Sequence, residues 1–139
     1  MFGQTSYVSE CNQHFFCLED VNSIYIEDNM VHFALASSHE FATVVKVQIE
    51  DFTRLYDQLN EAGCFVKLLT DFDNRILVNA FRFSALYKDE SLEKNWPQRI
   101  LFVDGSRASH RIKLSDVKAF HDKIMPVKRG DKRADKLAM

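Results

Sequence analysis

The sequence predicts a mainly β or α+β fold: an antiparallel sheet or a small barrel-like β domain with one internal helix and one C-terminal helix. Short segments rich in β-branched and aromatic residues outnumber segments with helical periodicity, and brief polar turns separate them. Strands joined by short turns usually pair with their neighbours in antiparallel orientation. With 12 Phe but only 4 Gly and 2 Pro in 139 residues, the composition indicates a thick aromatic core rather than a disordered chain.

The stretch at the centre of this prediction is 71–88, DFDNRILVNAFRFSALYK. Its middle part, Ile76–Phe83, is the densest apolar and β-branched run in the chain, and Arg75 is the one cation of the polar turn before it. Such a run is typical of a strand buried largely on both faces. Asn79 within this run suits a buried amide that satisfies backbone groups at a bend.

Before this stretch the pattern predicts an opening strand, a meander of three strands and a helix. The opening strand lies within 13–19, and the meander comprises 21–27, 30–36 and 39–47, with turns at 27–29 and 37–38. From Ile49 to Ala62 apolar residues recur at helical spacing, and Gly63 is a natural C-cap for this helix.

After the helix we expect a strand at 64–69, the central strand, a charged loop at 89–98, a hairpin and a closing helix. Asp104–Gly105 predicts a type I′ turn between strands 99–103 and 106–113. We expect Ser115 to cap the closing helix and Pro126 to end it, with the following side chains facing inward: Val117, Phe120, His121, and Ile124 or Met125.

The length and the charge distribution favour one domain with a basic end. We expect a single globular domain at 1–125 and a basic, mobile tail at 126–139. Residues 1–98 hold 7 Lys or Arg against 15 Asp or Glu, whereas residues 99–139 hold 11 against 5. The sequence shows no signal peptide and no membrane helix, which favours a cytoplasmic protein. The three cysteines contain no CxxC pair and are expected to be reduced thiols.

No pattern in the sequence indicates an enzyme or a cofactor. The four glycines are far apart, which excludes a Gly-rich phosphate loop, and the histidines never fall at His-x-x-x-His spacing. Cys11, His14 and Cys17 are the nearest approach to a metal cluster, but they lack a fourth ligand nearby, so we expect no metal site there. Cys64 after the capping glycine is typical of an inert core thiol.

Four short motifs resemble the LytTR-type DNA-binding domain, which reads DNA through loops of an antiparallel β domain. They are CFVKL at 64–68, DNRILVN at 73–79, LFVDG at 101–105 and SHR at 109–111, followed by a closing helix. The similarity spans roughly residues 14–124. The resemblance implies a small DNA-binding transcriptional regulator.

The same resemblance implies that Asn74, Arg75 and Arg111 face double-stranded DNA. Three neighbours, Arg107, His110 and Lys113, lie close enough in sequence to reach phosphates. Charges on the outer face of an edge hairpin strand would also explain these cations, because such charges discourage edge-to-edge pairing of sheets.

A second hypothesis is therefore a protein-interaction or oligomerisation module, such as a homodimer, without nucleic-acid contact. Its contacts would come from an edge strand or from Trp96 in the charged loop. The position of the cations in space separates the two hypotheses. Convergence of the basic residues and the tail on one face favours DNA, whereas acidic residues of the meander among them favour a protein partner.

Overall fold

The computed structural model of this protein describes residues 6–8, 15–36, 43–48, 52–72, 74–90 and 99–137. Its strands are β1 (Ser6–Val8), β2 (Phe15–Cys17), β3 (Val21–Glu27), β4 (Met30–Leu35), β5 (Thr43–Gln48), β6 (Phe65–Leu69), β7 (Arg75–Asn79), β8 (Phe83–Tyr87), β9 (Arg99–Phe102) and β10 (Arg107–Ser109). Its helices are η1 (Leu18–Asp20, a 3-10 helix), α1 (Phe52–Ala62) and α2 (Leu114–Lys128). None of the helices within these residues is long and apolar enough to cross a membrane.

The described strands form three antiparallel sheets. The largest has the order β5-β4-β3-β7-β6, the second has the order β10-β9-β8, and β1 pairs with β2. The predicted class, mainly antiparallel β with one internal and one C-terminal helix, is confirmed. The sheets stay open and do not close into a barrel.

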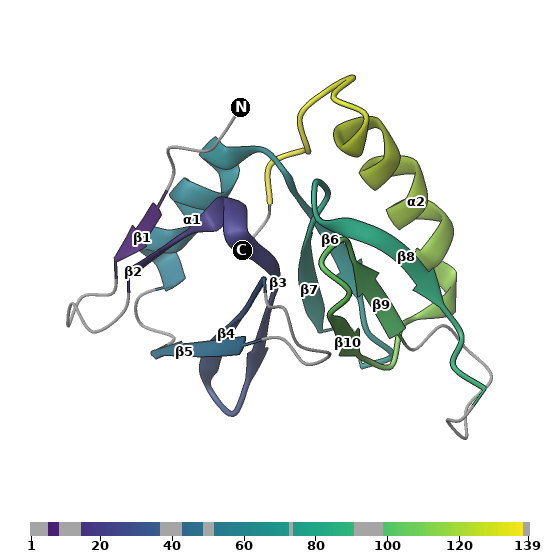
Figure 1. Cartoon of the computed structure of the whole chain (residues 1–139), viewed down its shortest axis with the longest axis horizontal. Coiled ribbons are helices and arrows are strands. Elements are labelled where there is room, and N and C mark those ends of the chain that lie inside the picture. The colour runs from purple at the N-terminus through teal and green to yellow at the C-terminus, as the bar shows by residue number, and fades with distance from the viewer. Residues whose placement is uncertain are drawn as a thin grey trace.

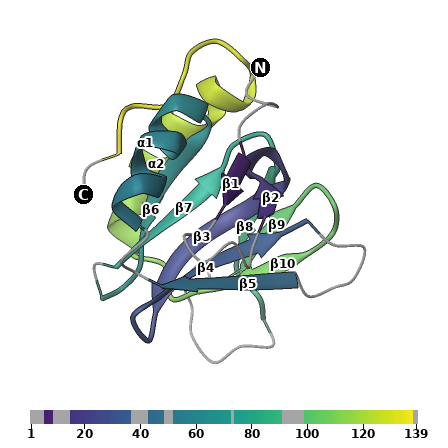
Figure 2. The same ribbon diagram turned by 90° about the vertical axis from the view of Figure 1, so that its left-hand side faces the viewer.

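The five-stranded sheet separates two cores (Figures 1 and 2). In Figure 1, α1 and α2 lie on opposite sides of β6 and β7. Side chains in a strand point alternately to the two faces. Leu77 therefore packs with Leu59 of α1 and Phe33 of β4, whereas the adjacent Ile76 packs with residues of α2 and the second sheet. The second sheet and α2 together cover the face of the five-stranded sheet that is opposite α1.

The N-terminal meander has the predicted order and nearly the predicted bounds. Asp28 and Asn29 between β3 and β4 have φ values of 54° and 60°. Both central residues of a type I′ turn need positive φ, and Asp and Asn tolerate it better than most residues. The predicted turn at 37–38 and the first residues of the third strand lie outside the described residues.

The expected central strand is in fact two strands that belong to different sheets. β7 ends at Asn79, a turn follows at 80–82, and β8 begins at Phe83. The buried Asn79 amide donates to the Val21 carbonyl at 2.9 Å, and its Oδ1 accepts the Phe81 N–H at 3.0 Å. The predicted role of Asn79 at a bend is thus confirmed. A single strand to Phe83 was wrong because this turn contains apolar residues, which the alternation pattern cannot distinguish from a strand.

The hairpin between β9 and β10 turns through three residues instead of two. The Phe102 N–H donates to the Ser106 carbonyl at 3.0 Å, which leaves 103–105 as the loop. Gly105 has a φ of 88°, whereas Asp104 is not at positive φ. This is the arrangement of a type I turn followed by a residue that needs a left-handed conformation. The predicted type I′ turn was therefore wrong, although the hairpin itself is present.

The helices differ from prediction at their ends. In α2 the N-cap is Lys113, and its first turn already contains Ser115, so the predicted Ser115 cap is wrong. Pro126 lies inside the last turn and does not end the helix. Phe120 and Ile124 face inward as expected, but His121 is exposed, and Val127 takes the next buried position.

Residues 129–137, expected to belong to a mobile tail, return to α1. The Ala134 N–H donates to the Gly63 carbonyl at 2.9 Å, and the Leu137 N–H donates to Asn60 Oδ1 at 2.7 Å. The Arg133 guanidinium donates to the Glu61 carbonyl at the end of α1, and the Leu137 side chain packs against the first core. Packed structure therefore continues well past the boundary expected at residue 125.

Candidate functional site

A groove of about 610 Å³ lies between the five-stranded sheet and the chain around β10. Residues 25–27 of β3 and 74–76 form one part of its lining, and Arg99 with residues 107–111 forms the other. Four arginines line the groove: Arg75, Arg99, Arg107 and Arg111. We call this surface the arginine groove.

The arginine groove contains most of the DNA-contacting residues that the sequence predicts. Asn74, Arg75, Arg107, His110 and Arg111 all line it, although the chain separates the first two from the others. Lys113 is the exception: it caps α2, its N–H donates to the Leu69 carbonyl at 2.9 Å, and it does not line the groove.

Arg75 borders the groove, but its guanidinium is engaged on the other face of the sheet. It donates from Nη1 to the Tyr56 hydroxyl of α1 at 2.9 Å. Alternation along β7 places Arg75 on the same face as Leu77, which packs in the core that includes α1. Among the predicted residues that line the groove, Arg75 is thus the least suited to contact a ligand there.

Arg111 and Phe72 are exposed members of the lining and contact each other. The Arg111 guanidinium carbon lies 4.9 Å from the centre of the Phe72 ring, within the range of a cation–π contact. Arg111 Nη2 also donates to Asp71 Oδ2 at 3.1 Å. The segments that carry Phe72 and Arg111 are also joined through the backbone, because the Asp71 N–H donates to the Arg111 carbonyl at 2.7 Å.

Carboxylates offset part of the positive charge. Glu27 of β3 lies in the lining, Asp71 pairs with Arg111, and Asp89 accepts from Arg99 Nε at 2.7 Å. The four lining arginines exceed the one lining carboxylate by three charges. Including the two paired carboxylates reduces the excess among the described residues to one. An anionic ligand must therefore compete with Asp71 and Asp89 for two of the arginines.

His110 is a neutral, packed member of the groove. Its ring lies 5.0 Å from the Tyr25 ring in an edge arrangement, and His32 stacks on Tyr25 at 4.9 Å. Burial lowers the pKa of His110 to about 4 because desolvation penalises the imidazolium. The ring is therefore uncharged at neutral pH, and it would contact a ligand through packing or a hydrogen bond rather than through charge.

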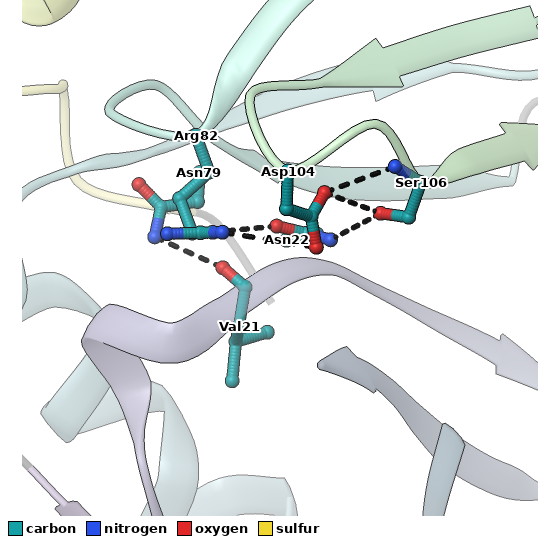
Figure 3. A network of polar contacts seen from close by, with 6 residues as sticks. All are labelled: Val21, Asn22, Asn79, Arg82, Asp104 and Ser106. Carbon is teal, nitrogen blue, oxygen red and sulfur yellow. Dashed lines mark hydrogen bonds and ion pairs between the residues drawn. The ribbon is translucent and has the colours of Figure 1, made fainter. Parts of the chain in front are cut away.

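A buried polar network holds the hairpin that carries Arg99 and Arg107 (Figure 3). The buried Asn22 of β3 donates to Ser106 Oγ at 2.8 Å and accepts from Arg82 Nε at 2.7 Å. Ser106 Oγ in turn donates to Asp104 Oδ1 at 2.7 Å, and Asp104 lies 3.8 Å from Arg82 Nη2. We call these four residues the buried network. It joins β3, the turn before β8 and the β9–β10 hairpin, and so links the two main sheets.

The sequence interpretation missed three members of the groove. Arg99 was assigned only to a strand, Tyr25 only to the meander, and Phe72 only to a polar turn. Phe72 alone had a usable signal, because a large aromatic residue flanked by two aspartates is not explained by a solvent-exposed turn. The sequence around Tyr25 and Arg99 contains no such signal, because the packing of the two sheets brings these residues to the same groove.

The position of the cations, which separates the DNA hypothesis from the protein-partner hypothesis, agrees with each of them in part. Arg75, Arg107 and Arg111 line one groove, but the Arg75 guanidinium binds Tyr56 on the other face of the sheet, and Lys113 lies outside the groove. The C-terminal residues 129–137 lie at α1, and Glu27 of the meander lines the groove together with the arginines. Cys11 and His14, for which we expect no metal site, and Trp96 of the charged loop lie outside the described residues. Within those residues no three His, Cys, Asp or Glu side chains are placed to hold a metal ion. Burial raises the pKa of the Cys64 thiol to about 12.

No family model matches this chain, and it has no significant similarity to a curated protein or to a solved structure. The resemblance to the LytTR-type domain therefore stays a prediction. What can be concluded about function has to come from the arginine groove itself.

Proposed function

We propose that this protein is a non-enzymatic DNA-binding protein that contacts DNA through the arginine groove. One observation carries the proposal: Arg107 and Arg111 line the same concave surface as Asn74, which a distant part of the chain supplies. The sequence alone predicts all three residues as DNA contacts. A guanidinium offers planar, bidentate donors and keeps its charge, which suits a phosphate or a guanine edge.

The exposure of the Arg111–Asp71 ion pair in the groove supports this proposal. Arg111 and Asp71 are both about half exposed, with side chains 48% and 42% accessible. Exposed pairs of this kind contribute only about 0–1 kcal/mol to stability, so a phosphate can displace the carboxylate at small cost. A role in transcription regulation is part of the same proposal and is supported only by the motif resemblance.

A protein-interaction module is the second candidate, and the position of β5 favours it. β5 ends the order of the five-stranded sheet, and among the described residues it pairs only with β4. The exposed Val44 of β5 adds an apolar side chain next to this edge. An incoming strand could pair with such an edge. Lys46, exposed in the middle of β5, opposes this pairing as charges on edge strands generally do.

The proposal is tested by fluorescence anisotropy of labelled random-sequence DNA, both duplex and single-stranded, over a series of salt concentrations. Affinity should fall linearly on a log-log plot of binding constant against salt, because phosphate contacts release counterions. Arg107→Ala should weaken binding and lower the salt slope by about one.

Lys118→Ala is the matched control, because it removes one exposed positive charge from α2, outside the groove. It should change neither the affinity nor the slope. If neither form of DNA binds at low salt, or if the two variants weaken binding equally, the groove is not a DNA site. In that case a concentration-dependent dimer in sedimentation, abolished by Val44→Asp in β5, would favour the interaction module.

A further inference from the structure

The shape of the arginine groove restricts the form of nucleic acid that can enter it. Its volume of about 610 Å³ falls in the range of roughly 300–1,000 Å³ that holds small ligands and cofactors. A double helix is a rigid, convex object whose major groove alone is about 12 Å wide, and proteins read it with elements that protrude. A duplex would contact the rims of a concave site and leave its floor empty, whereas a flexible single strand can bend into it.

The apolar part of the lining also suits unpaired bases. Phe72 at the groove is 67% exposed, although burial of a large apolar side chain is normally favourable. Ile26, Ala34 and Val44 add an apolar surface from β3, β4 and β5. Bases in a duplex are stacked on one another, so an exposed aromatic ring can reach their faces only at the cost of unstacking a base step. An unpaired base can stack on the ring, whatever its sequence.

The charged groups are placed to hold the backbone of such a strand. Arg111 lies over the Phe72 ring, and Arg107 lines the same groove four residues earlier in the chain. A planar surface for a base next to donors for a phosphate is the combination by which single-stranded nucleic acids are bound without strong sequence preference.

We infer that the arginine groove binds a short stretch of single-stranded DNA, with a base stacked on Phe72 and phosphates held by Arg107 and Arg111. This inference rests on the proposed function and narrows it, because it assigns the groove to unpaired rather than to double-stranded DNA. The protein then would bind DNA where the strands are separated, at ends, loops or melted regions.

The test compares two labelled probes in anisotropy titrations of the full chain: a short oligothymidine, which does not pair with itself, and a hairpin duplex with the same number of phosphates. The oligothymidine should bind at least about tenfold more tightly. Phe72→Ala should weaken its binding roughly 5- to 100-fold, the effect of losing one aromatic stack on a base. The salt slope should stay unchanged in this variant, because no phosphate contact is removed.

Phe81→Ala is the matched control. Phe81 is also an exposed phenylalanine in a turn, 46% accessible, but it lies between β7 and β8 and does not line the groove. Its removal should leave oligothymidine binding intact. Far-ultraviolet circular dichroism and thermal melting of both variants check that each remains folded.

Three outcomes would overturn the inference in distinguishable ways. If the duplex binds more tightly, with an affinity that depends on Arg107 but not on Phe72, the protein is a DNA-binding protein and the assignment to single strands is wrong. If Phe72→Ala and Phe81→Ala reduce oligothymidine binding equally, the groove is not its site. If neither probe binds, the proposed function fails together with the inference.

Discussion

The arginine groove and the buried network each contain a pair of an arginine and an aspartate, and the Arg111–Asp71 pair of the groove is more exposed than the Arg82–Asp104 pair of the network. In the buried network the Arg82 side chain is 21% exposed, and Asn22 and Asp104 both hold its guanidinium. In the groove the Arg111 side chain is 48% exposed, and its partner Asp71 is nearly as accessible. Arg82 thus has its polar partners inside the protein, whereas the Arg111–Asp71 pair is open to solvent.

The difference in burial determines what each arginine contributes. A pair with little solvent access is costly to break, because the remaining charge keeps its desolvation cost without its partner. A pair that is half exposed is screened by water and contributes little to folding. Arginine content alone therefore does not identify a binding surface in this protein. The partners that each guanidinium has in the fold distinguish a structural arginine from a candidate ligand-binding one.

The largest expected effect is on stability, from Asp104→Ala in the buried network. This change removes the acceptor of Ser106 and the carboxylate next to Arg82. We expect the free energy of unfolding to fall by about 2–4 kcal/mol, measured by urea denaturation followed by circular dichroism. Asp71→Ala in the groove is the counterpart and should cost less than about 1 kcal/mol. Equal losses in the two variants would remove the distinction between the two regions.

The second expected effect is a dependence of stability on pH, which arises from His110 in the groove. The pKa of His110 is lowered to about 4 in the folded protein, against about 6.5 in an unfolded chain. Protonation therefore favours unfolding. The contribution of the neutral ring to the free energy of unfolding is complete above pH 6.5. As the pH falls to about 4, up to about 3 kcal/mol of this free energy is lost.

Urea denaturation at several pH values measures this loss. His110→Phe keeps an aromatic ring against Tyr25 but cannot be protonated, so its stability should fall less steeply between pH 6.5 and 4 than that of the unchanged protein. Parallel curves for the two proteins would show that His110 does not couple to folding.

The third effect tests whether the hairpin connects the two regions. Gly105 has a φ of 88° and open space around the position of an added Cβ, so Gly105→Ala should cost only backbone strain, about 1–2 kcal/mol. Gly130 after α2 is a close match, with a φ of 80° and equally open space. Both substitutions should lower the melting temperature similarly, but only Gly105→Ala should also weaken DNA binding. An equal effect of both on binding would mean that the hairpin does not position the groove.

The smallest effect on stability is expected from Asp71→Asn, which removes the charge of the exposed pair in the groove. The amide keeps the size of the side chain but removes the charge that pairs with Arg111. Stability should change by less than about 1 kcal/mol, whereas affinity for DNA should rise severalfold because a phosphate no longer competes with a carboxylate. Unchanged or weaker binding in anisotropy titrations would show that Arg111 does not contact the ligand.

Local signals predicted much of the secondary structure. β3, β4, α1 and β6 were found close to their bounds, because alternation, helical periodicity and the Gly63 cap are properties of short segments. The errors at Phe83, Ser115 and Pro126 occurred where segments meet. Tertiary contacts override local preference at these three places. They are the turn at 80–82 after Asn79, the start of α2 and the last turn of α2.

By itself, then, the sequence determined the class of fold, the meander, the internal helix and a short set of candidate cations, since each of these depends on neighbours along the chain. Only the tertiary structure decided which cations meet. It brought Arg107 and Arg111 to the turn that carries Phe72, turned the Arg75 guanidinium toward Tyr56, and placed Lys113 at the start of α2. The physical reason is that the groove forms between two sheets whose strands are far apart in sequence, so its geometry depends on the packing of two cores rather than on any local pattern.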